Sequence, residues 1–276
     1  MLKSSLFALL LLCGYVEAQI SFLGDGEAQQ VQVLHNEFRS AGLRSFKATV
    51  ERQALAFPNF FLQGSGDEKR IALSFDDGPD NKYTPQILDI LAEYEVKASF
   101  FALGWRLEHY PQTARRIVSE GHLLAGHSMN HPDLRDYSAE TAYLEEIAPT
   151  QDLILSLGGQ ADYFRPPYGA LTDEEILYLA DKGIKVVNWS IDSLDWNRDS
   201  SSEQILANVL NYAHAGGIVL MHSIPVGGPK SLAVLARVIE ALRVEGYEFV
   251  RVDVLVEDLV EGVLEPPRPI SLNIPF

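Results

Sequence analysis

Cysteine is almost absent from this chain: one of its 276 residues, Cys13, is a cysteine. No disulfide can therefore form within the chain, and its stability must come from a packed core. Basic residues are also scarce, with 22 lysines and arginines against 38 acidic residues and a net charge of −16. This deficit argues against a nucleic-acid partner, which requires a basic surface, and it disfavours docking to anionic membranes.

The N-terminal apolar run, Leu6–Cys13, is too short to cross a bilayer comfortably. It follows a basic residue and precedes Val16-Glu17-Ala18, which has small residues at the two positions that a signal peptidase recognises. We therefore expect a signal peptide over residues 1–18, cleavage before Gln19, and export to the periplasm or the extracellular space without stable membrane insertion. Lipoprotein anchoring at Cys13 is the alternative, which the bulky Leu12 disfavours.

Length and composition predict one large α/β domain with an additional segment, since 47% of residues are hydrophobic and 22% are charged. Residues 19–69 are expected to form an N-terminal helical extension and linker, because Val31, Leu34 and Phe38 have helical spacing and residues 64–69 are rich in glycine. We expect these helices to pack on the outside of the main domain, residues 70–255. A proline-rich C-terminal tail is expected over residues 256–276.

Short apolar runs alternate with helical patterns through the main domain. The predicted strands are residues 71–75, 98–103, 122–125, 163–164, 185–190, 218–221 and 248–252. The predicted helices include 84–94, 111–120, 139–157 and 232–244, and two more that begin at capping boxes, Thr172 with Glu175 and Ser201 with Gln204. About seven β/α repeats imply parallel strands and a closed or nearly closed barrel.

Polar groups gather at or just after five of these strands. An α/β barrel collects its catalytic groups at the carboxyl ends of its strands, so groups that are far apart in the sequence are expected to share one face. The five stretches are Ser74–Gly78, His127–His131, Arg165–Gly169, Asp192–Trp196 and Leu220–His222.

Two of the stretches suggest a metal site. His127 and His131 are four residues apart, but Pro132 disfavours a helix there, so we expect a loop with both imidazoles directed to one point. Two neutral imidazoles and a carboxylate suit a divalent metal of the zinc kind. Asp76 and Asp77 leave their strand in different directions, so one can bind the metal while the other remains a free base. From spacing alone, ordinary loop histidines would be the better interpretation, and Asp-Asp-Gly-Pro is also a favourable turn sequence.

Taken together, the five stretches resemble the five motifs of the polysaccharide deacetylases of the NodB-homology type, carbohydrate esterase family 4. The motifs are intact and in order, and the resemblance covers roughly residues 69–252. It implies a deformed (β/α) barrel and a hydrolase that removes N-acetyl groups from a polysaccharide such as chitin oligomers or peptidoglycan. It also implies one divalent metal, with zinc expected and cobalt, nickel or manganese as alternatives.

The resemblance assigns a role to each matching residue. Asp77, His127 and His131 match the metal ligands. Asp76 matches the catalytic base, and Arg165 matches the residue that holds this base in place.

The remaining matches concern the leaving group and the substrate. Tyr168 matches a substrate-contacting position whose backbone N–H helps to form the oxyanion hole. His222 matches the catalytic acid, and Asp195 matches the carboxylate that tunes this histidine. Trp196 matches a position that helps to wall the substrate groove.

Three other functions fit parts of the pattern. An O-acetyl esterase acting on acetylated polysaccharide such as xylan would use the same groups. A non-haem iron oxygenase also uses two histidines and a carboxylate, but it does not need a paired carboxylate or an acid–base set. A catalytically silent glycan-binding module would not need Asp76 and His222. We expect a monomer whose partner is an acetylated glycan.

Overall fold

A computed structural model describes residues 45–260 of the chain. The expected signal peptide, Cys13, the helical pattern of residues 31–38 and the last part of the expected tail lie outside the described residues. All the described strands belong to one compact unit, which begins at Thr49. No helix among the described residues is both long and apolar enough to cross a membrane.

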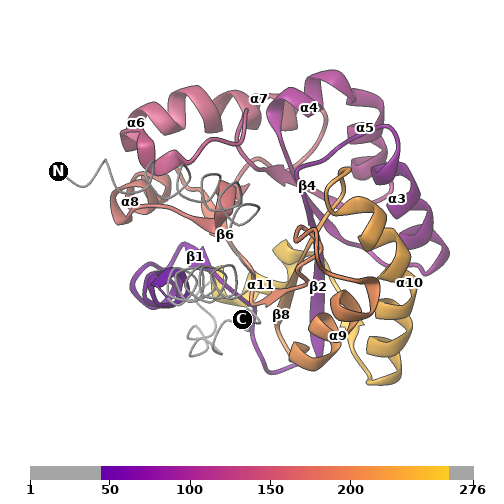
Figure 1. The fold of residues 1–276 in the computed structure, drawn as a ribbon. Helices are drawn as coiled ribbons and strands as arrows, with labels where there is room; N and C mark the ends of the chain where they lie inside the picture. Colours follow the sequence, from indigo (N-terminus) through magenta and orange to yellow (C-terminus); the bar gives the residue numbers. More distant parts are fainter. Residues whose placement is uncertain (1–44, 261–276) are drawn as a thin grey trace, which may run out of the picture. The chain divides into compact units, whose positions relative to one another are not determined.

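A curled parallel sheet of nine strands forms the centre of this unit (Figure 1). Eight strands run in the order β1-β6-β5-β4-β3-β2-β8-β7, and β9 pairs with β2 in addition. Their bounds are β1 Phe60–Phe61, β2 Arg70–Asp76, β3 Ser99–Ala102, β4 Leu123–Gly126, β5 Tyr163–Phe164, β6 Lys185–Val187, β7 Ile191–Asp192, β8 Gly217–His222 and β9 Glu248–Phe249. The predicted fold class, a deformed (β/α) barrel, is confirmed.

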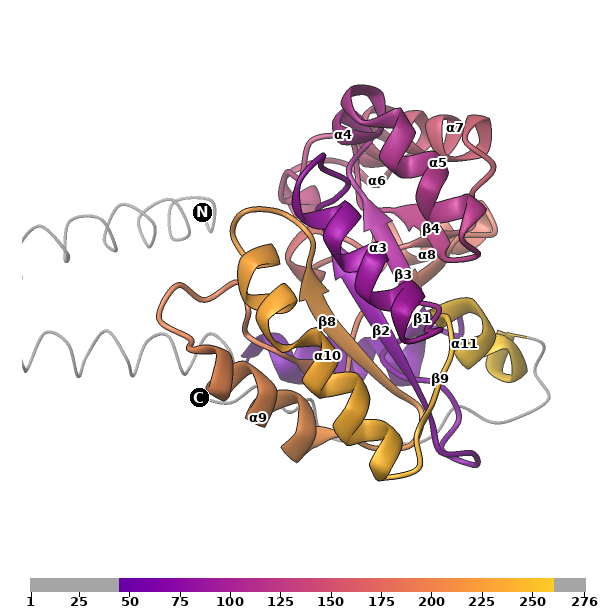
Figure 2. The same cartoon turned by 90° about the vertical axis from the view of Figure 1, so that its right-hand side faces the viewer.

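Helices cover the outside of the sheet (Figure 1). They are α3 Tyr83–Glu93, α4 Gly104–His109, α5 Pro111–Ser119, α6 Ala139–Ala142, α7 Ala148–Ser156, α8 Asp173–Asp181, α9 Ser202–Tyr212, α10 Gly228–Val244 and α11 Val252–Val260. Figure 2 shows α3 and α10 in front of β2 and β8, and these two helices contact each other. Both predicted capping boxes are present, at the first turns of α8 and α9.

The main core lies between the sheet and these outer helices. Phe75 of β2 and Phe100 of β3 stack with ring centroids 5.2 Å apart, and both side chains are buried. Ile87, Leu88 and Leu91 give α3 a buried face in the same cluster. Burial of each such side chain contributes roughly 1.5–3 kcal/mol, so the core rigidly fixes the strands whose ends carry the polar stretches.

The structure differs from the predicted elements in several places. β1 and β7 have two residues each, which is too short for a periodic signal. The predicted strand 248–252 ends at Phe249, and α11 begins at Val252 and continues to Val260 where an extended tail was expected. The predicted helix 139–157 is interrupted by a π-helical turn, Tyr143–Ile147, between α6 and α7.

Residues 45–56, which precede β1, are helical. The part of this helix that belongs to the compact unit contacts the start of α8. Within the compact unit, Gln53 donates from Nε2 to the Leu171 carbonyl at 2.9 Å. Arg52 forms an ion pair with Asp173 at the first turn of α8, with 2.6 Å between Nη2 and Oδ1. These contacts agree with the expectation that this part of the extension packs on the main domain.

Candidate active site

Strand pairing brings the five polar stretches to one edge of the sheet. β2 ends at Asp76, β4 at Gly126, β5 at Phe164, β7 at Asp192 and β8 at His222. All the strand pairs are parallel, so their carboxyl ends meet at the same edge. Asp76 and His222 are register partners in the β2–β8 pair. The backbone alone therefore places the expected base and the expected acid side by side.

Asp77, His127 and His131 form the group that could hold a metal. One ligand atom from each residue lies within 4.8 Å of the other two. The Asp77 Oδ1 atom is 3.4 Å from His127 Nε2 and 3.5 Å from His131 Nε2. Ligand atoms about 2.05 Å from a tetrahedral ion lie roughly 3.3 Å apart, so the carboxylate–imidazole separations fit. Asp77 Oδ1 is also buried with no hydrogen-bond partner among the described residues, so this oxygen could serve as a metal ligand.

The pKa shifts in this group bear on cation binding in different directions. Burial raises the pKa of Asp77, but the neighbouring His127, His222 and His131 outweigh it and hold that pKa well below its usual range. Burial and the His127 charge lower the pKa of His131. Burial lowers the pKa of His127, but Asp76 and Asp77 outweigh it and raise that pKa. A bound cation would therefore displace a proton from His127.

Hydrogen bonds fix the His127 imidazole and the backbone of the loop that carries His131. The Nδ1–H of His127 donates to the Arg165 carbonyl at 2.7 Å, which leaves the Nε2 lone pair directed at Asp77. The backbone N–H of His131 donates to Ser128 Oγ at 2.9 Å. Ser128 and His131 adopt positive φ values of 70° and 64°, which are uncommon for residues other than glycine. The loop is therefore held in a strained backbone shape that aims both rings at one point.

A buried ion pair lies beside this group. Arg165 is fully buried, and its Nη1 donates to Asp76 Oδ1 at 2.7 Å and to Ser74 Oγ at 2.9 Å. Its other donors bind the carbonyls of Val187 and Asn188 at 2.9 and 3.0 Å. Asp76 Oδ2 is 3.8 Å from His127 Nε2. Arginine remains charged when buried, so the Asp76 carboxylate is paired, oriented and close to the metal group without being part of it.

His222 and Asp195 form a second buried pair. The Nδ1–H of His222 donates to Asp195 Oδ1 at 2.7 Å, and the His222 backbone N–H donates to Oδ2 at 2.7 Å. Ser231 Oγ also donates to Oδ2, at 2.5 Å. Burial lowers the pKa of His222, but the charge and hydrogen bond of Asp195, together with Asp77 and Asp76, outweigh it and raise that pKa to about 10. The imidazolium is therefore the stable form at neutral pH, and its Nε2 remains available for proton transfer.

Tyr168 and Trp196 lie on two of the segments that follow the strands. Tyr168 has φ of 59°, and its side chain is 60% exposed, with the ring edge-on to His131 at 4.7 Å between centroids. The Trp196 indole N–H donates to Asp192 Oδ1 at 3.1 Å. Asp192 also accepts from the Leu194 backbone N–H at 2.8 Å, which makes it a turn cap, and burial raises its pKa to about 6.

Three contributors to the site were not identified from sequence. Ser74 accepts a hydrogen bond from Arg165. Ser231 of α10 donates to Asp195, which lies 36 residues earlier in the chain. A Cβ atom at Gly227 would lie 2.6 Å from Asp195 Oδ2 and 2.7 Å from His222 Cβ, so only glycine permits this approach. Ser74 is part of the first motif, but no sequence signal identifies Ser231 or Gly227.

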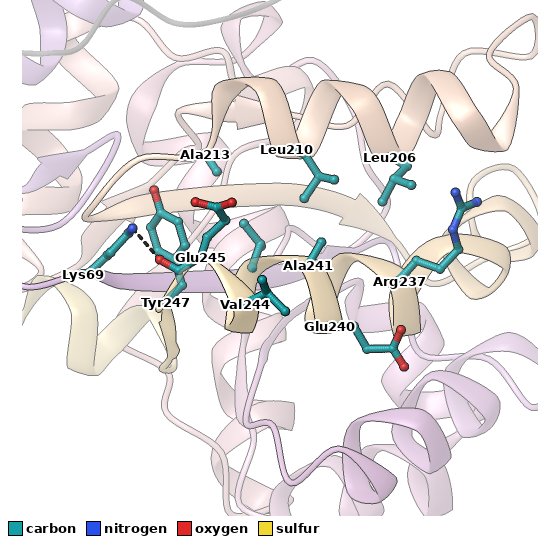
Figure 3. Close-up of a pocket in the computed structure, with 11 residues that line it drawn as sticks. Lys69, Leu206, Leu210, Ala213, Arg237, Glu240, Ala241, Val244, Glu245 and Tyr247 are labelled. Carbon is teal, nitrogen blue, oxygen red and sulfur yellow. Dashed lines mark hydrogen bonds between the residues drawn. The ribbon is translucent and has the colours of Figure 1, made fainter.

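A groove of about 640 Å³ lies elsewhere, between α9 and α10 (Figure 3). Leu206, Leu210 and Val244 line it, with Lys69 and Ala213 at one end. Lys69 precedes β2 and Ala213 precedes β8, so the groove reaches the amino ends of strands whose carboxyl ends carry the candidate site. None of the candidate site residues lines it.

The fold and the site together define a deformed (β/α) barrel with a potential metal site, flanked by a carboxylate–arginine pair and a carboxylate–histidine pair. The family model described as polysaccharide deacetylase matches residues 63–187. A peptidoglycan-N-acetylglucosamine deacetylase of Bacillus cereus is 37% identical over 203 residues, which are 73% of this chain and 71% of that protein. A chitooligosaccharide deacetylase of Rhizobium leguminosarum bv. trifolii is 39% identical over 175 residues, which are 63% of this chain and 80% of that protein.

A solved structure agrees with these relatives. The Bc1960 peptidoglycan N-acetylglucosamine deacetylase matches with a TM-score of 0.69 and 33% identity, over 72% of this chain and 93% of that chain. The chain belongs to the polysaccharide deacetylase family. The resemblance expected from the five motifs is confirmed, and membership of a family of amide hydrolases decides against an oxygenase.

Proposed function

We propose that this protein hydrolyses the N-acetyl amide of N-acetylglucosamine residues in a glycan, either peptidoglycan or chitin oligomers. The names of the Bacillus cereus and Rhizobium relatives support this substrate class. The observation that carries the proposal is the convergence of three groups at one sheet edge: the potential metal ligands, the Asp76–Arg165 pair and the Asp195–His222 pair.

Asp77, His127 and His131 would hold one divalent metal, and zinc is proposed because two imidazoles and a carboxylate suit it. When bound, such a metal would lower the pKa of a water molecule and polarise the acetyl carbonyl. The remaining steps depend on the side chains of this chain.

Asp76 is proposed as the general base that takes the proton of the attacking water. Its pairing with Arg165 supports this role, because the guanidinium, 2.7 Å from Oδ1, holds the carboxylate beside the potential metal ligands. Four donors of Arg165 have partners, so the guanidinium also fixes the direction of the carboxylate.

His222 is proposed as the general acid that gives its Nε2 proton to the departing amine. The raised pKa of about 10 supports this role, since the imidazolium must be populated before the C–N bond breaks. Asp195 holds Nδ1–H and so directs Nε2 away from itself.

The backbone N–H of Tyr168 is proposed as a donor to the oxyanion that develops on the acetyl oxygen. Its location on the turn after β5, next to His131, supports this role. The exposed Tyr168 ring and the Trp196 indole are proposed as surfaces for the sugar, because aromatic faces pack well against its apolar C–H groups.

Acetate release tests the proposal. The purified protein is incubated with N-acetylglucosamine oligomers, peptidoglycan and acetylated xylan, before and after chelator treatment and after restoring zinc. We expect acetate from an N-acetylated glycan, loss of release with chelator, and recovery with zinc. Release from xylan alone would instead identify an O-acetyl esterase, and no release from any glycan by the zinc-loaded protein would identify a silent binding module.

A further inference from the structure

Several backbone groups of the loop that carries both histidines form hydrogen bonds. His127 N–H donates to the Ala102 carbonyl at 2.9 Å, and the carbonyls of Ser128 and Met129 accept from the backbone of α4 at 3.0 and 3.2 Å. His131 N–H donates to Ser128 Oγ. Between these anchors lies Asn130, whose partner comes from a different element.

Glu146 binds Asn130 through both of its carboxylate oxygens. Oε2 accepts from the Asn130 backbone N–H at 2.8 Å, and Oε1 accepts from the Asn130 side-chain amide at 3.0 Å. Glu146 is 6% exposed. No cation pairs with it among the ion pairs of residues 45–260, so both oxygens of a buried carboxyl group bind one neighbour of a potential metal ligand.

The backbone around Glu146 departs from a regular α-helix. Glu146 lies in the π-helical turn Tyr143–Ile147, and Pro149 follows. Proline has no N–H, and its ring would clash with the carbonyl of residue 145 in a regular helix, so the wider turn accommodates it. Thr150 Oγ1 donates to the Glu146 carbonyl at 3.0 Å and fixes the turn. Turns of this kind are frequent at functional sites.

We infer that Glu146 is a positioning residue for the metal site: it holds Asn130, and through it His131, in the geometry that binds a cation. This inference rests on the proposed function, because it presumes that Asp77, His127 and His131 bind a metal. Outer-shell partners of metal ligands typically change metal affinity by about 10–100-fold.

The donor–acceptor pattern suggests an exchange experiment. In Glu146→Gln, the single amide oxygen can accept from only one of the two Asn130 donors, the backbone N–H or the side-chain amide. The NH₂ group of the glutamine then faces the remaining donor, with which it cannot form a hydrogen bond. In the double variant Glu146→Gln/Asn130→Asp, the amide oxygen accepts from the backbone N–H of position 130, and the NH₂ group donates to the introduced carboxylate. The pairing is therefore broken in the single variant and restored in the double variant.

Metal affinity is measured with Zn²⁺ and Co²⁺ alone, by competition with a chelator, and the absorption spectrum of bound Co²⁺ reports ligand geometry. We expect Glu146→Gln to weaken both metals by roughly 10–100-fold and to alter the Co²⁺ spectrum, and the double variant to recover most of the loss. Ser201→Ala, which removes the cap of α9, is the control: it should lower stability in urea and leave affinity unchanged.

Unchanged affinity in a folded Glu146→Gln protein, or a double variant no better than the single one, would overturn the inference. If Glu146→Gln does not fold, Asn130→Ala is measured in its place, because it removes only the hydrogen bond from the Asn130 side chain to Glu146 Oε1. A metal affinity equal to that of wild type would then overturn the inference. A wild-type protein that takes up neither metal would refute the proposed function first, and the inference with it.

Discussion

The raised pKa of His222 makes a direct prediction about pH dependence. The ordinary value for histidine is 6.5, and the Asp195 carboxylate is the main group that raises it, to about 10. If His222 is the acid, kcat/KM should fall as pH rises through its pKa in the enzyme, because only the imidazolium can donate. A bound divalent cation near Asp77 would lower this pKa somewhat, so the alkaline limb should lie above neutrality but below 10.

Asp195→Asn is the perturbation that isolates the cause. Removing a carboxylate in hydrogen-bond contact should lower the pKa of His222 by roughly 1–3 units, and the alkaline limb should move to lower pH by that amount. The amide adds a second effect. Asp195 accepts three hydrogen bonds, from His222 N–H, His222 Nδ1–H and Ser231 Oγ. One asparagine oxygen cannot replace both carboxylate oxygens, so an NH₂ group facing Nδ1 would further disfavour the imidazolium.

The assay compares two substrates. Rates against pH are measured for wild type, Asp195→Asn and His222→Ala on an N-acetylglucosamine oligomer and on an aryl acetate. His222→Ala should be far slower on the amide and less affected on the ester, whose leaving group needs little protonation. Equal slowing on both substrates, with an alkaline limb that does not move in Asp195→Asn, would refute the acid role and leave His222 as a groove residue.

Three further predictions concern the base, the metal and export. Asp76→Asn should keep its metal but lose activity by roughly 10²–10⁴-fold, and it should unfold at lower urea concentration because Arg165 loses its carboxylate partner; near-normal turnover of the metal-loaded variant would contradict the base assignment. His127→Ala should contain much less metal by elemental analysis than wild type, whereas His222→Ala should match it, and equal content in all three would remove His127 from the ligand set. Mass spectrometry of exported protein should show an N-terminus at or near Gln19; a lipidated Cys13 would instead place the protein on a membrane.

Most of the candidate site could be predicted because its residues directly follow apolar strands. Asp76, Arg165 and His222 lie at or next to the ends of β2, β5 and β8, and parallel pairing alone brings such ends together. The first turns of α8 and α9 were also predictable, since Thr172 and Ser201 begin capping boxes that act within four residues.

The remainder depended on contacts between distant segments. Ser231 reaches Asp195 because α10 packs against β8. No local sequence pattern predicts such a contact. The π-helical turn has a local signal in Pro149, because proline disturbs a regular helix. α11 has one as well: Val252, Leu255 and Val256 have helical spacing and are buried, but Val252 also continues the apolar pattern of the preceding strand.

The β2–β8 register has a consequence for how this enzyme can be altered. Because Asp76 and His222 are register partners on two neighbouring strands, the spacing between them is set by backbone geometry and not by any connecting loop. The segments that follow β3 and β7 can therefore be exchanged or lengthened without resetting that spacing. A library confined to residues 106–110 and 197–200 would therefore vary the surroundings of the site while leaving in place both Asp195, which binds His222, and the contacts of Gly104 and Trp105 with the histidine loop.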